Sequence, residues 1–300
     1  MNWFFVALIA PILFSVSNYI DKFLLSRYFK KGAVGALTIF SSAIGAFILP
    51  TIYLIQPSAV KINPTFAVII ISSGFLYIIS LIPYLKALEK DDSSVVVPLF
   101  QLIPVFIYFL GYILLGETLS LRQILASLLV ISGAFILSLE HKSGKIKKEV
   151  LGLMVLSCFL VSFNIVIFKV VAINEDFWTT SFWEYSGFAL CGILLLVFIK
   201  SYRKQFFSMI RKSAGAVISI NFFNEAINIV AKIIMNFAAL FVPVVLVSVI
   251  GGLQPFFIFV FGILLSVFFP GFIKENLERK YLIQKLAAII IMFAGTAILI

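Results

Sequence analysis

The chain has 300 residues, of which 62% are hydrophobic and only 12% charged, and its net charge is +10. Such an apolar composition excludes a soluble globular domain and indicates a protein that crosses a membrane several times. In such a protein an excess of Lys and Arg reports the orientation of the loops rather than nucleic-acid binding. The two cysteines, Cys158 and Cys191, lie in apolar runs without a CxxC pattern, so we expect neither a disulfide framework nor a metal site.

Apolar windows of about 20 residues follow one another along the chain, separated by short charged or turn-rich breaks. The first window lacks a basic start and a small-x-small cleavage site, so we expect a retained helix rather than a signal peptide. The sequence therefore predicts an all-α integral membrane protein with ten transmembrane helices. They are expected near residues 3–20, 34–55, 65–85, 94–115, 121–139, 150–173, 177–199, 214–240, 242–269 and 281–300.

The two halves of the chain resemble each other in one consistent order. The segment that begins at Pro104, PVFIYFLGYIL, aligns with PFFIFVFGILL from Pro255 at an offset of 151 residues, and the first helices of the halves align at 147. Because each half has five helices, an odd number, the second must be inverted relative to the first, a recurrent transporter plan. We predict two inverted repeats, 1–140 and 150–300, joined by a basic loop over 141–149. Duplication in a purely structural membrane protein is the alternative.

The orientation follows from the basic residues. Of the 23 Lys and Arg residues, 19 lie after the first, third, fifth, seventh and ninth predicted helices or in their flanks. The positive-inside rule then predicts that both termini lie outside the cytoplasm. The same basic segments suit anionic lipid headgroups.

A stripe of polar residues runs along the predicted helix 214–240. At about 100° per residue, its members fall within an arc of roughly 120° and extend over about 22 Å. They are Asn221, Asn224, Glu225, Asn228, Lys232 and Asn236. Lipid cannot satisfy these groups, so the stripe must face protein or water. It predicts either the lining of a polar cavity or a set of ion-pair and amide contacts between helices.

Glu225 is a candidate proton carrier, because burial disfavours the charged form of a carboxyl group. Lys232 lies two turns further along the same face and is its expected counter-charge. A permanent structural ion pair between the two is the alternative. The asparagines suit zwitterionic or hydroxylated ligands, and each could equally form a hydrogen bond between helices.

Three motifs of the first half carry a family resemblance. Residues 84–88 (YLKAL) have an aromatic-x-x-Ala-Leu pattern, Pro104 lies in the fourth predicted helix, and residues 116–123 (GETLSLRQ) form a Gly-Glu-x-Leu-Ser-x-x-Gln loop. These motifs resemble the drug/metabolite transporter superfamily, in its EamA-type ten-helix branch, and the resemblance covers the whole chain. Ala126 stands where the family usually has glycine, and the second half has no equivalent Gly-Glu pair.

The resemblance implies a secondary transporter that moves small metabolites by alternating access. Its central cavity would be lined by the first, third and fourth helices and by the sixth, eighth and ninth. The candidate cavity residues are Asn18, Tyr77, Tyr84, Gln101, Asn164, Lys169, Glu184, Asn221, Asn224, Glu225, Asn228, Lys232 and Gln254, with Pro104 and Pro255 as helix hinges.

Plainer interpretations accompany several of these candidates. Lys169 lies near a helix end and could extend its ammonium group to the membrane surface. Glu184, beside Trp183, could belong to an interfacial belt. The two prolines could form static kinks. Glu117, in the Gly-Glu loop, is expected to cap or brace the turn between the fourth and fifth helices rather than contact substrate.

No constellation typical of an enzyme is present, so we expect no catalytic activity, no cofactor and no metal. The expected partners are a small-molecule substrate and the lipid bilayer of the cell (plasma) membrane, with no nucleic acid, and the protein is expected to be a monomer or homodimer. Without an ATP-binding domain, an exporter or exchanger must use proton coupling, another gradient or exchange. A flippase for a lipid-linked headgroup and a non-transporting membrane scaffold are the alternatives.

Overall fold

The computed structural model describes residues 3–27, 34–90, 96–138, 147–212, 215–268 and 279–299, which are almost entirely helical. Within these residues nine segments are long and apolar enough to cross a membrane, and Ile283–Leu299 is a shorter apolar helix that corresponds to the predicted tenth. The prediction of an all-α membrane protein is therefore confirmed. Most of the predicted linker 141–149 lies outside the described residues.

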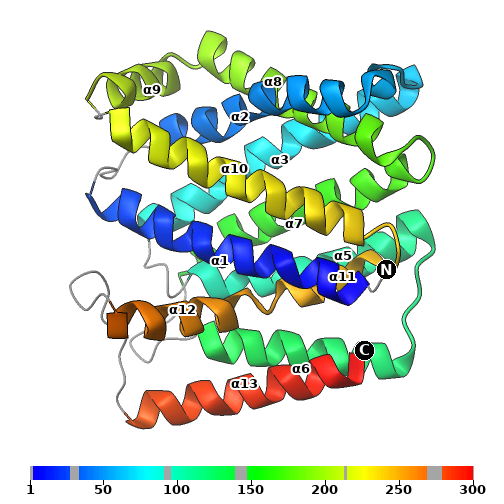
Figure 1. The fold of residues 1–300 in the computed structure, drawn as a ribbon, viewed down its shortest axis with the longest axis vertical. Helices are drawn as coiled ribbons and strands as arrows, with labels where there is room; N and C mark the ends of the chain where they lie inside the picture. Colours follow the sequence, from blue (N-terminus) through cyan, green and yellow to red (C-terminus); the bar gives the residue numbers. More distant parts are fainter. Residues whose placement is uncertain are drawn as a thin grey trace.

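The helices lie side by side and are stacked along the long axis of the molecule (Figure 1). The first half contains α1 (Trp3–Arg27), α2 (Val34–Ile55), α3 (Pro64–Lys90), α5 (Leu102–Leu115) and α6 (Leu121–Ser138), with the 3-10 turns η1 (Pro57–Val60) and η2 (Val97–Gln101). The second half contains α7 (Lys148–Ala172), α8 (Phe177–Phe198), α9 (Lys200–Lys212), α10 (Gly215–Ala238), α11 (Val244–Gly251), α12 (Gln254–Phe268) and α13 (Arg279–Leu299).

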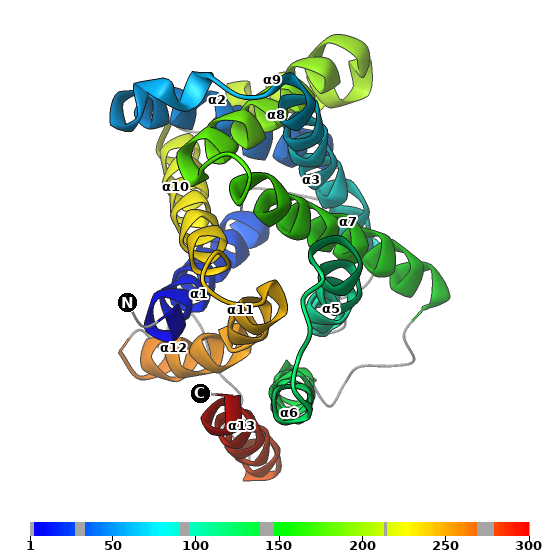
Figure 2. The same cartoon turned by 90° about the vertical axis from the view of Figure 1, so that its right-hand side faces the viewer.

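The packing of the helices fits an inverted repeat. The first helix of each half packs against the third and fourth helices of the other half: α1 contacts α10 and α12, and α7 contacts α3 and α5. The second helices, α2 and α8, pack together, and so do the fifth helices, α6 and α13. These two pairs lie at opposite ends of the molecule (Figure 2). These contacts are thus made symmetrically by the two halves.

Glycines allow the fifth helices to approach closely. A Cβ atom on Gly133 would lie 2.5 Å from the side chain of Met292, and one on Gly295 would lie 2.8 Å from the carbonyl oxygen of Ala126. Only a residue without a side chain fits at either position. The two glycines are equivalent in the repeat, so the same close contact is made from both halves.

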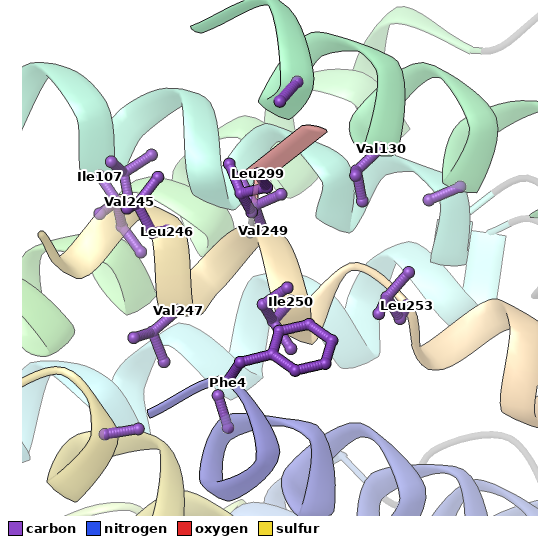
Figure 3. Packing of buried hydrophobic residues seen from close by; sticks show 14 of the residues in the cluster. Phe4, Ile107, Val130, Val245, Leu246, Val247, Val249, Ile250, Leu253 and Leu299 are labelled. Carbon is purple, nitrogen blue, oxygen red and sulfur yellow. The ribbon is translucent and has the colours of Figure 1, made fainter. Parts of the chain in front are cut away.

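The largest apolar cluster is centred on α11. Val244 through Ile250 are at most 8% exposed, as expected for a helix that is hydrophobic on all sides. Val245 lies beside Ile107 of α5 and Ile250 lies beside Phe4 of α1 (Figure 3), and Val249 belongs to the same cluster as Val130 of α6. The cluster joins helices of both halves and holds α11 inside the bundle.

The structure has both predicted spans, as Val97–Leu115 and Val244–Ser266, but each consists of two helical segments. Single helices were expected over 94–115 and 242–269, but the first divides into η2 and α5 and the second into α11 and α12. Pro104 and Pro255 each lie in the first turn of the later segment, where the missing backbone N–H and the fixed φ angle are tolerated.

The segment between α8 and α10 was expected to be a loop, and it forms α9 instead. Tyr202 and Phe206 pack against the apolar cluster of α2 and α8, while Lys200, Arg203 and Lys204 are exposed. This division of apolar and basic faces is typical of a helix that lies along a membrane surface. The sequence of this segment already shows apolar residues spaced among basic ones. The segment as a whole is too polar to resemble a transmembrane window.

Candidate functional site

A fully buried carboxylate forms the centre of the polar contacts. Glu184 of α8 is 0% exposed and forms an ion pair with Lys232 of α10, at 3.2 Å between Oε1 and Nζ. Asn164 of α7 connects them: its Nδ2 donates to Glu184 Oε1 at 2.8 Å and its Oδ1 accepts from Lys232 at 2.9 Å. Asn236 donates weakly to the other oxygen, at 3.5 Å. We call these four residues the central cluster. A buried ion pair is tolerated when hydrogen bonds satisfy it in this way.

Aromatic rings of α3 and α8 cover the central cluster. The ammonium group of Lys232 lies 4.5 Å from the centre of the Tyr77 ring, within cation–π range. Tyr77 is stacked on Phe188, with ring centres 5.0 Å apart. The lysine charge is therefore compensated by a carboxylate, an amide and the face of an aromatic ring.

A second group of acidic residues lies further toward the start of α10. Glu225 accepts a hydrogen bond from Ser41 Oγ of α2 at 2.6 Å, and Asp21 of α1 accepts one from Asn224 Nδ2 at 2.6 Å. The two carboxylates interact as like charges. Both are partly exposed, unlike Glu184. We call Asp21, Ser41, Asn224 and Glu225 the acidic cluster.

A third group lies beyond the end of α10. Lys169 of α7 forms an ion pair with Glu117 at 2.6 Å and donates to the Val242 carbonyl oxygen at 2.7 Å. The other carboxylate oxygen of Glu117 accepts the backbone N–H of Val244, the first residue of α11, at 2.8 Å. A carboxylate at a helix start satisfies an otherwise unpaired N–H and complements the helix dipole. This end cluster ties the Gly-Glu loop of the first half to two helices of the second.

The two broken helices are held by equivalent serines. Ser15 Oγ of α1 lies 3.1 Å from the carbonyl oxygen of Gln254, and Ser162 Oγ of α7 lies 3.1 Å from that of Ile103. Each hydroxyl shares its hydrogen with the carbonyl oxygen four residues earlier in its own helix, Pro11 at 2.6 Å and Cys158 at 2.7 Å. The serines differ by 147 positions and the acceptors by 151, which are the repeat offsets of the sequence. Each acceptor directly precedes one of the two prolines. The first helix of each half thus contacts the proline break of the other half.

The structure divides the predicted site residues among these clusters. Asn164, Glu184 and Lys232 meet in the central cluster, with Tyr77 against it. Asn224 and Glu225 meet in the acidic cluster. Lys169 belongs to the end cluster. The remaining predicted residues lie on the same helices or at the helix breaks: Asn221 and Asn228 on α10, Asn18 on α1, Tyr84 on α3, and Gln101 and Gln254 beside the breaks.

Three interpretations from the sequence need correction. Lys232 pairs with Glu184 rather than Glu225, because two helical turns separate positions 225 and 232 by about 10 Å. Glu184 is fully buried, which contradicts an interfacial position. Lys169 is 8% exposed and paired with Glu117, so its ammonium group is buried in the protein instead of being exposed.

Some residues of the site were missed in the sequence. Asp21 was passed over because it directly precedes Lys22 at a predicted helix end, although it is the only acidic residue of the first helix. Ser15, Ser41 and Ser162 resemble the many small hydroxyl residues of membrane helices, and no spacing distinguishes them. Only the repeat offset could have indicated that positions 15 and 162 are equivalent.

The comparisons with known proteins agree with this fold. Residues 1–139 match the EamA-like transporter family. A solved crystal structure shares the fold over 99% of this chain and 94% of its own length, with a TM-score of 0.62 at 16% sequence identity. A comparison with curated proteins finds no match.

Proposed function

We propose, from the match of residues 1–139 to the EamA-like transporter family, that the whole chain is a secondary transporter that exports or exchanges small metabolites by alternating access. The nine apolar helices long enough to cross a membrane among the described residues and the family match over residues 1–139 support a multi-pass membrane transporter. Substrate, coupling and mechanism are the subject of the proposal, and the cell (plasma) membrane is its proposed location.

The observation that carries the proposal is the succession of polar clusters along α10. The acidic cluster includes residues 224 and 225, the central cluster includes 232 and 236, and the end cluster lies just beyond the helix, at Val242 and Val244. Apolar residues alone would suffice to pack a membrane helix. Ionisable groups at three successive levels are costly in a membrane and are typical of a substrate or ion path.

The contacts between the halves suggest how access alternates. At one end the Glu117–Lys169 ion pair connects the repeats, while at the other Asp21 and Glu225 are partly exposed. We interpret this arrangement as a state closed at the Glu117 end. The paired proline breaks, each held by a serine of the opposite half, are the places where the two repeats can move relative to each other.

Glu225 is the proposed proton carrier of this cycle. It accepts one hydrogen bond from Ser41 and has no cationic partner among the described residues, so its proton affinity is free to change when substrate binds. Asp21 is the second carboxylate that can share this role. Lys232, by contrast, is held by Glu184 and Asn164 and acts in the proposal as a fixed positive charge.

The test is uptake into proteoliposomes with a panel of amino acids, amines, sugar phosphates and nucleotide sugars, with and without a pH gradient. At least one panel member should accumulate with the wild-type protein, and Glu225→Gln should abolish the response to the pH gradient. Glu149→Gln, on the surface, is the matched control for the loss of a carboxylate. Failure of the folded protein to move any panel member would contradict the proposed function, and unchanged coupling in Glu225→Gln would exclude this residue as the proton carrier.

A further inference from the structure

The acidic cluster differs from the central and end clusters in having no counter-ion among the described residues. Lys232 neutralises Glu184, and Lys169 neutralises Glu117. Asp21 and Glu225 form no ion pair with a described residue, and they repel each other. Two like charges within a membrane protein are unfavourable unless a cation or protons accompany them.

The carboxylates have spare hydrogen-bonding capacity. Each accepts one side-chain hydrogen bond, Asp21 from Asn224 and Glu225 from Ser41, through one of its two oxygens. An ionised carboxylate can accept several more. Both side chains are also partly exposed.

Unsatisfied amides beside the carboxylates are a second and independent sign of a ligand. Asn221 is 4% exposed and Asn224 is 1% exposed, yet Asn221 Nδ2 and Asn224 Oδ1 have no hydrogen-bond partner among the described residues. Asn221 lies one turn before Asn224 and Glu225 on the same face of α10. A buried polar atom without a partner is costly, so these atoms indicate that a polar group is bound here in the functional state.

We propose that the acidic cluster binds the ammonium group of a positively charged organic amine, and that this amine is the transported substrate. The inference rests on the proposed transport function and specifies its substrate class. Asp21 and Glu225 supply the charge, Asn224 Oδ1 accepts a further N–H of the ammonium group, and Asn221 Nδ2 donates to a polar substituent of the ligand.

The surroundings favour an ammonium group over a metal ion or an anion. No group of three or more His, Cys, Asp or Glu side chains that could hold a metal ion occurs in the described part of the chain. Tyr77 of α3 holds the ammonium group of Lys232 against its ring, 4.5 Å from the ring centre, so an aromatic face that accepts a cation is present on a neighbouring helix. An anion is repelled by both carboxylates.

The experiment measures binding to the purified full-length protein in detergent by isothermal titration calorimetry. The probes are n-butylammonium chloride, the neutral analogue butyramide and sodium chloride. The proteins are wild type, Asp21→Asn, Glu225→Gln, the double variant, and the surface control Glu149→Gln. Asp21→Asn and Glu225→Gln keep the side-chain volumes and are readily checked for folding by their melting temperature.

The expected result is saturable binding of butylammonium to the wild type and to Glu149→Gln, weakened at least about tenfold in each single variant and lost in the double variant. A charge-assisted hydrogen bond is worth about 1.5–3 kcal/mol, which corresponds to this factor or more. Equal binding of butyramide, or unchanged affinity in the folded double variant, would overturn the proposal. If sodium binds to the wild type more tightly than butylammonium does, the acidic cluster is a site for a metal ion and the amine proposal is overturned.

The two proposals fail in different ways. If the proteoliposome assay detects transport of an uncharged or anionic metabolite and butylammonium does not bind, the transport function stands and the amine assignment falls. If butylammonium binds as expected and no panel member is transported, the site is correct and the transport function falls.

Discussion

The central and acidic clusters lie about two turns apart on α10. They differ in whether their carboxylates are neutralised by the protein. Glu184 is fully buried and receives an ammonium group and two amides from its own protein. Asp21 and Glu225 are partly exposed, and each receives a single neutral donor. The charge and hydrogen-bonding groups of the central cluster are therefore satisfied without a ligand, whereas those of the acidic cluster are not. Substitutions should therefore affect the stability of the first and the ligand binding of the second.

The largest effect is expected at Lys232. Lys232→Met leaves Glu184 buried without a cation, which should destabilise the fold by about 3–5 kcal/mol. The measurement is the melting temperature in detergent. The double variant Lys232→Met/Glu184→Gln removes both charges and should recover most of the loss. A single variant as stable as wild type would show that the central ion pair is not the permanent support that we describe.

The end cluster should show a smaller effect on stability. Glu117→Gln removes the ion pair to Lys169 and weakens the contact to the Val244 N–H, so we expect a loss of about 1.5–3 kcal/mol. Because the pair joins the two halves at one end, a cysteine placed in that region should also become more reactive toward a membrane-impermeant maleimide. Glu149→Gln, whose side chain is 67% exposed, is the control. Unchanged maleimide reactivity would argue against closure at this end.

The repeated serines should have equal and modest effects. Ser15→Ala and Ser162→Ala each remove one hydroxyl contact to a proline break, which should cost about 0.5–1.5 kcal/mol of unfolding free energy. Thermal unfolding of both variants, with Ser132→Ala as an exposed control, measures this cost. Clearly unequal losses at positions 15 and 162 would mean that the two breaks are not energetically equivalent.

The acidic cluster should show the smallest effect on stability. Asp21→Asn and Glu225→Gln remove like charges that repel each other, so each should change the unfolding free energy by less than about 1 kcal/mol or stabilise the protein. The melting temperature without ligand is the measurement. A loss comparable to that of Lys232→Met would make the acidic cluster a structural element and remove its contrast with the central cluster.

The sequence could predict the features that follow from composition and periodicity. Apolar windows predicted the membrane helices, the offsets of 147 and 151 predicted the inverted halves, and the periodicity of α10 predicted that its polar residues share one face. It also indicated that residues 200–212 are basic, but not that Tyr202 and Phe206 pack against α2 and α8 as part of a helix.

Only the tertiary structure decided which side chains form ion pairs and hydrogen bonds with each other. Lys232 shares a helix face with Glu225 but pairs with Glu184, and Glu225 meets Ser41, 184 positions away in the chain. A helical period determines which residues point in one direction, and it carries no information about which helix lies opposite. The sequence by itself thus determined a membrane protein of repeated halves with one polar helix. The packing of α1, α2, α7 and α8 around that helix decided which carboxylate is neutralised and which pair is left for a ligand, because charges are compensated across helices rather than along them.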